Sequence, residues 1–130
     1  MFGYVKGWKW RNKSEYAYAL PHEFEGKAFH GTHLILEHRV LTVMEGYGWD
    51  GASGPAIDTE DFMRGSMIHD ALYEIIGKKG WFKLRKAADK ELVQICKEDG
   101  MPWVRRSYTY RAVRIFGGRY VKKRYEDFTR

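Results

Sequence analysis

Three residues whose types suit proton transfer stand close together in one apolar stretch of the chain: His69, Asp70 and Tyr73. A helical step of about 100° per residue puts His69 and Tyr73 on one face, with Asp70 beside them. Most of their neighbours are apolar, so this helix is buried on most sides and an ionisable group in it needs a partner. Asp89, beside the apolar stripe of the next helical stretch, supplies one if the two stretches pack antiparallel, as their short connection favours.

The chemistry of such a group is general acid–base catalysis. A carboxylate on one imidazole nitrogen of His69 fixes the tautomer and leaves the other nitrogen to take a proton from water. Asp70 then points elsewhere and needs a cation. Ca²⁺ binds backbone carbonyls together with one or two carboxylates, and residues 46–55, which hold four of the 14 glycines, can turn successive carbonyls inward. Two structural alternatives stay open: the ionisable residues equally fit a buried network that ties two helices together, and the glycines fit a tight turn.

The elements before the glycines read as strands. Residues 16–20, 32–38 and 40–44 are short runs rich in aromatic or aliphatic side chains and bounded by turn residues, which predicts a small antiparallel sheet. The glycines of residues 46–55 exclude a regular element there, so the sequence predicts a loop.

The elements after the glycines read as helices. Asp58 can cap a helix in which apolar residues recur at helical spacing as far as Gly77. A second helix is predicted over residues 82–98, with an apolar stripe along one face. A third is predicted over residues 103–116, closed by Gly117 and Gly118.

The fold class predicted from these elements is α+β, a small N-terminal antiparallel sheet followed by helices. The 130 residues suit a single domain. We divide it into a β-rich part (1–45), a glycine loop (46–58), a two-helix core (59–99), and a basic C-terminal helix and tail (100–130).

The net charge of +6 is unevenly distributed. Residues 101–130 hold nine of the 23 Lys and Arg and only two of the 17 Asp and Glu, which leaves the rest of the chain near neutral. This basic segment predicts an anionic partner: a phospholipid or membrane surface, or alternatively nucleic acid or an acidic virion or host protein. A solvated helix face is the equal structural alternative. The single cysteine and the absence of a long apolar run predict synthesis in the cytoplasm of a bacterial host without signal peptide or transmembrane segment, and virion association is a further expectation.

Two motifs resemble the secreted phospholipases A2. Residues 69–73, His-Asp-Ala-Leu-Tyr, resemble the His-Asp-x-Cys-Tyr active-site helix of that family, and residues 88–90 resemble the context of its second active-site Asp. Residues 47–55 approximate its Tyr-Gly…Gly-x-Gly…Pro calcium loop. The resemblance implies a phospholipase A2-like pair of antiparallel helices and a calcium-dependent ester hydrolase. It assigns catalysis to His69, Asp89 and Tyr73, and Ca²⁺ binding to Asp70, Tyr47, Gly48 and Gly51.

A closer resemblance is to a phage and prophage family of unknown function. Its combination of Gly-Tyr-x-Trp-Asp-Gly-Ser/Ala-Ser, Ser-x-x-His-Asp-x-Leu-Tyr and an Ala-Asp helix is matched by residues 46–53, 66–73 and 87–89. The function we predict is therefore a phage-encoded, calcium-dependent ester hydrolase of phospholipase A2 type. The alternative is a non-enzymatic virion or host-interaction protein that uses the same helices as a scaffold.

Overall fold

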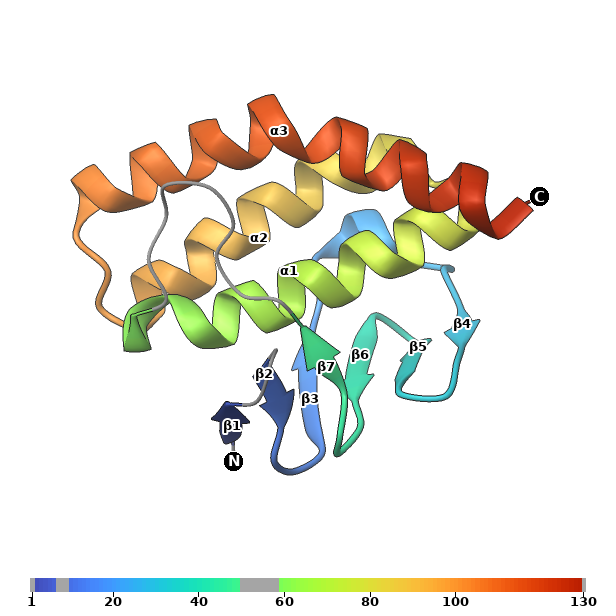
Figure 1. Ribbon diagram of the computed structural model, residues 1–130, viewed down its shortest axis with the longest axis horizontal. Coiled ribbons are helices and arrows are strands. Elements are labelled where there is room, and N and C mark those ends of the chain that lie inside the picture. Colours follow the sequence, from blue (N-terminus) through green and yellow to red (C-terminus); the bar gives the residue numbers. More distant parts are fainter. Residues whose placement is uncertain (1, 7–9, 50–58, 130) are drawn as a thin grey trace. The chain divides into compact units, whose positions relative to one another are not determined.

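The computed structural model describes residues 2–6, 10–49 and 59–129, and the chain forms two compact units, Met1–Gly51 and Ala52–Arg130. The first unit holds the strands and the second holds three long helices (Figure 1). The predicted α+β class, an antiparallel sheet region followed by helices, is confirmed. The boundary between the units falls within the predicted glycine loop, and the assignment of one domain stays a prediction.

The first unit contains two antiparallel sheets. The larger has the order β3-β6-β5-β4, with β3 at Tyr16–Ala19, β4 at Phe29–His30, β5 at Leu34–Glu37 and β6 at Val40–Val43. A short 3₁₀ helix, η1 (His22–Phe24), follows β3. Alternate residues of β5 and β6 are buried, and their register pairs Leu34 with Val43 and Leu36 with Leu41. The three predicted strands are therefore confirmed as β3, β5 and β6.

The smaller sheet has the order β1-β2-β7, with β1 at Tyr4–Lys6, β2 at Trp10–Asn12 and β7 at Gly48–Trp49. The prediction of a loop without regular structure is wrong at β7, where Trp49 pairs with Trp10 and packs with its ring centroid 6.3 Å from that of Tyr4. This aromatic packing favours an extended backbone that the glycine count alone argues against. Residues 50–58 lie outside the described part of the chain.

The first helix, α1 (Glu60–Lys79), is buried along most of its length. Thr59 occupies its N-cap position, and the predicted capping residue Asp58 lies outside the described residues. The predicted end at Gly77 is wrong, since the helix continues to Lys79 and ends at Gly80. Gly80 has a φ of 71°, in the left-handed region that glycine adopts without steric cost.

The second helical element starts as a 3₁₀ turn, η2 (Phe82–Leu84), and continues as α2 (Arg85–Glu98), so the prediction over 82–98 is confirmed. Helices α1 and α2 run antiparallel (Figure 1). They cross closely at Gly65, where an added Cβ would lie 3.0 Å from Leu92 Cδ1 and 3.1 Å from Cys96 Sγ. The glycine thus allows the two helices to approach each other.

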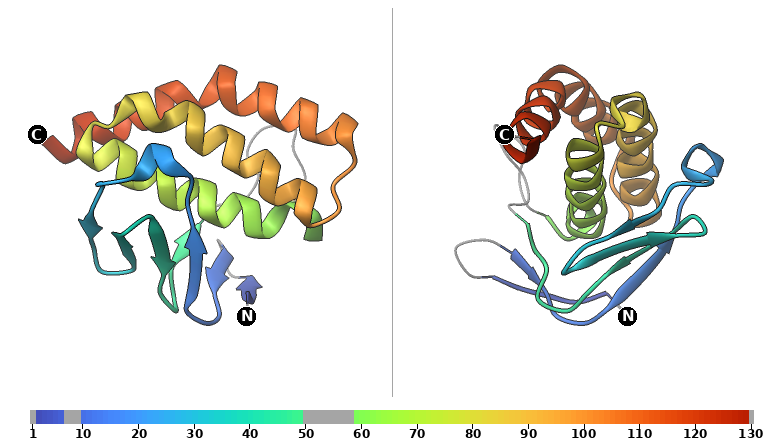
Figure 2. Two further views of the ribbon diagram at one scale, coloured as in Figure 1. Left: turned by 180° about the vertical axis from the view of Figure 1, so that it is seen from behind. Right: turned by 90° about the vertical axis from the view of Figure 1, so that its right-hand side faces the viewer.

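The third helix, α3 (Trp103–Thr129), runs straight through the two glycines predicted to end it. That prediction is wrong because Gly117 is buried within the helix and lies against Tyr73, so its missing side chain serves close packing and not termination. The three helices lie side by side in the second unit (Figure 2). None of the helices in the described residues is both long and apolar enough to cross a membrane.

Replacing Gly117 tests this close approach. Alanine favours a helix over glycine by about 1 kcal/mol, yet we expect Gly117→Ala to lower the free energy of unfolding by about 1–3 kcal/mol. The reason is that its Cβ would overlap the Tyr73 hydroxyl and lie 3.0 Å from Arg85 Nη1. Gly118→Ala is the matched control, because the nearest atom to its Cβ, Arg85 Cζ, is 3.7 Å away. Urea denaturation should show that Gly118→Ala is neutral or stabilising, and equal effects of the two substitutions would contradict the packing.

Candidate functional site

The three residues predicted to be catalytic come together between α1 and α2. Asp89 Oδ1 lies 2.7 Å from His69 Nε2 and also accepts a hydrogen bond from the Tyr73 hydroxyl. The Asp89 side chain is fully buried, and His69 is 6% exposed. The helical spacing of His69 and Tyr73 and the antiparallel packing of α2 produce this arrangement.

His69 is held in one orientation by these contacts. Its ring packs against that of Tyr73 with a centroid separation of 4.0 Å. Because an ionised Asp89 can only accept, Nε2 is the nitrogen that donates, and this fixes the tautomer of the neutral ring. Within the described part of the chain the other nitrogen, Nδ1, has no hydrogen-bond partner. The arrangement leaves a basic nitrogen on a ring that cannot rotate freely.

Two arginines complete the cluster. Arg114 Nη1, from α3, donates to Asp89 Oδ2 at 2.7 Å, and Arg85 Nη1 lies 3.5 Å from the same oxygen. Arg85 also donates to the Tyr73 hydroxyl at 3.3 Å and to the backbone carbonyl of Val113 at 3.0 Å. Sequence reasoning missed both. Arg85 stands four residues before Asp89, a spacing that favours an ion pair on a helix, whereas no local signal points to Arg114.

The donors around Asp89 decide its charge. Burial by itself raises the pKa of Asp89, but the hydrogen bonds from His69, Tyr73 and Arg114 outweigh it and lower the pKa. Burial and the neighbouring Asp89 carboxylate raise the pKa of the Tyr73 hydroxyl. At neutral pH the cluster therefore contains an ionised Asp89 and a protonated Tyr73.

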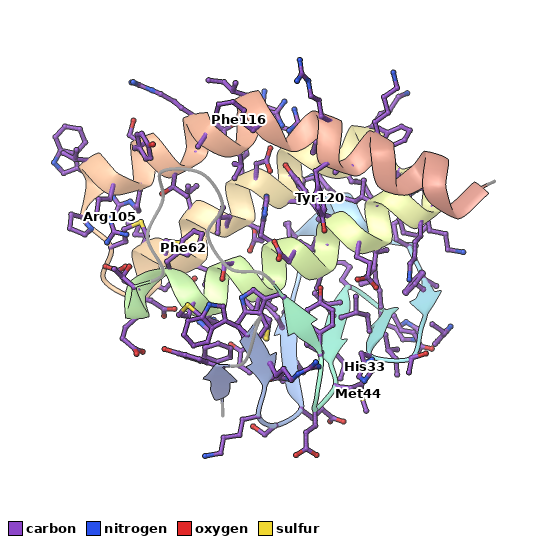
Figure 3. The ribbon with its side chains drawn as sticks, viewed as in Figure 1. His33, Met44, Phe62, Arg105, Phe116 and Tyr120 are labelled. Atoms are coloured by element: carbon purple, nitrogen blue, oxygen red, sulfur yellow. The ribbon has the colours of Figure 1, made fainter. Side chains whose placement is uncertain are left out.

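The aromatic surroundings of the cluster extend onto α3. The ring of Tyr120 is stacked 6.3 Å from that of Tyr73, between centroids. Figure 3 shows Tyr120 on the side of α3 that faces α1, whereas Phe116 points away from the bundle. Phe116 is 68% exposed. Helix α3 thus presents one face to the cluster and leaves apolar side chains on the other.

The residues predicted to bind Ca²⁺ are divided between the two units. Asp70 lies on α1 in the second unit, while Tyr47 and Gly48 belong to the first. The Tyr47 carbonyl accepts a hydrogen bond from the Asn12 backbone N–H at 2.8 Å, Gly48 lies in β7, and Gly51 lies outside the described residues. No group of three His, Cys, Asp or Glu suited to a metal occurs among the residues described. Calcium binding stays a prediction.

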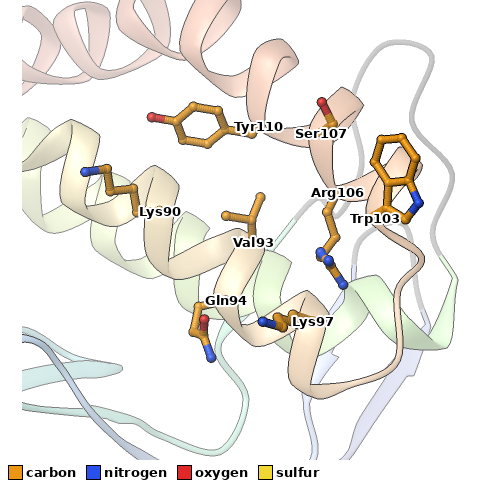
Figure 4. Close-up of a pocket in the computed structure, with 8 residues that line it drawn as sticks. All are labelled: Lys90, Val93, Gln94, Lys97, Trp103, Arg106, Ser107 and Tyr110. Carbon is orange, nitrogen blue, oxygen red and sulfur yellow. The ribbon is translucent and has the colours of Figure 1, made fainter.

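A shallow groove runs between α2 and α3 (Figure 4). We call it the α2–α3 groove, and it is lined by Lys90, Val93, Gln94, Lys97, Trp103, Arg106, Ser107 and Tyr110. A second hollow lies in the first unit, around residues 25–30 and 37–39. As far as the described residues show, neither is lined by His69.

Comparisons with known proteins give no information on the function of this site. The chain matches no family model, no curated protein and no solved structure. The resemblances to phospholipases A2 and to the phage family therefore stay predictions. The contacts of Asp89 and His69 carry the functional argument.

Neutralising Asp89 tests how much the cluster contributes to the free energy of unfolding. Asp89→Asn keeps the shape but leaves Arg114 and Arg85 without a carboxylate, so we expect the free energy of unfolding to fall by about 2–4 kcal/mol. Glu98→Gln is the control on the same helix, since Glu98 pairs with Arg64 at the surface and its loss should cost less than about 1 kcal/mol. Urea denaturation measures both variants, and equal losses would contradict a dominant role for Asp89.

The lowered pKa of Asp89 also predicts how the stability of the protein depends on pH. Because the pKa of folded Asp89 lies below its ordinary value of 3.8, the unfolded chain takes up the proton first as the pH falls. Its stabilising contribution is therefore complete above the ordinary value and is lost as the pH falls through the lower, folded one. Between about pH 5 and pH 2 the wild type should lose more stability than Asp89→Asn. Parallel acid-unfolding curves for the two proteins would overturn this assignment.

Proposed function

We propose that the chain is a phage-encoded ester hydrolase of phospholipase A2 type, in which His69 activates water. One observation carries the proposal: a buried carboxylate holds Nε2 of His69, while Nδ1 has no hydrogen-bond partner in the described part of the chain. This is the geometry that a general base requires, with one nitrogen oriented and the other available.

The chemistry follows from that geometry. Nδ1 of His69 takes a proton from water as the water oxygen attacks the carbonyl carbon of an ester. The imidazolium that forms is stabilised by the ionised Asp89. The proton then passes to the alcohol oxygen as the carbon–oxygen bond breaks, and a carboxylic acid and an alcohol leave.

The other cluster residues act through Asp89. Tyr73 and Arg114 each donate to one of its two oxygens, so the carboxylate keeps its charge and its orientation toward His69. Calcium stays a prediction within this proposal, and we assign no step to it.

The exposed face of α3 supports an anionic phospholipid surface as the partner. Five large hydrophobic side chains on it are exposed: Trp103, Val104, Tyr108, Ile115 and Phe116. Exposed cations interleave with them, among them Arg111 and Arg119. Apolar residues beside cations on one helix face are typical of helices that lie on anionic membranes.

Removing the base tests the proposal. In His69→Gln the side-chain amide can still donate to Asp89, but no basic nitrogen remains. We expect hydrolysis of phospholipid vesicles, assayed as fatty acid released with and without Ca²⁺, to fall by about 100-fold or more. The free energy of unfolding should change by less than about 1 kcal/mol. His33→Gln, at an exposed histidine of the first unit (Figure 3), should leave both quantities unchanged. Hydrolysis that survives His69→Gln would overturn the assignment.

A second candidate function is a non-enzymatic virion or host-interaction protein. The observation in its favour is that Asp89 draws donors from all three helices, as a structural tie would. On this hypothesis the wild-type protein hydrolyses no phospholipid under any condition. His69→Gln would then reduce stability alone.

A further inference from the structure

The α2–α3 groove has two regular walls. Residues 90, 93, 94 and 97 of α2 form one wall, and residues 103, 106, 107 and 110 of α3 form the other. Both sets have the spacing i, i+3, i+4, i+7, so each lies on one face of its helix. The floor between them includes the half-buried Val93.

The groove is cationic. Lys90, Lys97 and Arg106 line it, and no lining residue is acidic. Among the described residues Lys90 and Lys97 form no ion pair. Glu98 in α2 and Asp99 just after it are bound by Arg64 at 2.9 and 3.1 Å, which reduces their effect on the groove. Asp89 and Glu91, on either side of Lys90 in α2, do not line the groove. The groove therefore suits an anionic ligand.

The groove also presents two aromatic rings, both on the α3 wall. Trp103 is 71% exposed and Tyr110 is half-buried. They stand seven residues apart, or about 10 Å along the helix. Lys90 and Lys97 have the same spacing on the opposite wall, and Figure 4 shows Arg106 extending toward that wall. Both rings stand on the α3 wall, and the two lysines stand on the α2 wall with Arg106 extending toward them, which matches a polymer with bases along one edge and phosphates along the other.

We propose that the α2–α3 groove binds single-stranded nucleic acid, with bases on Trp103 and Tyr110 and phosphates on Lys90, Lys97 and Arg106. Unpaired strands leave their base faces open to aromatic side chains, whereas a duplex does not. An acidic peptide would pair with the cations, but it gives no reason for two aromatic rings to line the wall opposite the lysines. This inference goes beyond the proposed function and does not depend on it.

Fluorescence anisotropy of a labelled oligothymidine of about 12 nucleotides tests the proposal on the full chain. Three neutralised phosphates predict a plot of log affinity against log salt with a slope of about −2. Trp103→Ala should weaken binding roughly 5-fold or more, because one stacked base is lost, while Trp103→Phe retains most of the affinity. Trp103 is exposed, so the fold of the variant is expected to be unchanged.

Charge variants separate the groove from the rest of the basic surface. The double variant Lys90→Gln/Lys97→Gln should reduce the salt slope to about −0.7. Lys86→Gln, an exposed lysine of α2 outside the groove, is the matched control and should bind like the wild type. Binding of polyglutamate that equals binding of the oligonucleotide, or affinity unchanged by Trp103→Ala, would overturn the proposal.

Discussion

The buried Asp89 carboxylate is the constraint on which the helical unit depends. An ion without solvent is tolerated only if its oxygens are matched by donors, and here the donors come from α1, α2 and α3. Each helix must therefore keep one position along its neighbours, because sliding by a turn would separate a donor from the carboxylate. Apolar packing alone would tolerate several such positions. The charge thus selects one arrangement among those that bury the same apolar surface.

The close approach of the helices follows from the same constraint. Arg85 reaches the backbone carbonyls of Val113 and Arg114 on α3 while its other contacts are with Tyr73 and Asp89. The side chains of Tyr73 and Arg85 can approach α3 this closely only where that helix has no side chain of its own. Gly117 meets that condition inside α3. A residue that weakens an isolated helix is here required by the packing.

The sequence predicts those parts of this arrangement that depend on residues close together along the chain. The strands β5 and β6 follow from short runs of aliphatic residues bounded by turn residues, and the pairing of His69 with Asp89 follows from helical spacing and a short connection. The pairing of Arg114 with Asp89 cannot be predicted in this way, because it depends on how α3 lies along α2 at a separation of 25 residues. The glycines of α3 mislead for a related reason: their local preference is to end a helix, and tertiary contacts override it. The two-residue strand β7 carries too few residues for any periodic signal.

The contacts of the basic side chains change which of them are available to bind an anionic partner. The sequence places the positive charge in residues 101–130, but Arg105 is paired with Asp61 and Arg114 is paired with Asp89. These side chains stabilise the bundle, so the formal charge of the segment overstates what is available to a partner. Lys90 and Lys97 belong to the near-neutral part of the chain and yet face the groove. Recognition of an anion by this protein therefore depends on the arrangement of α2 against α3, and through it on the buried carboxylate that holds both helices in place.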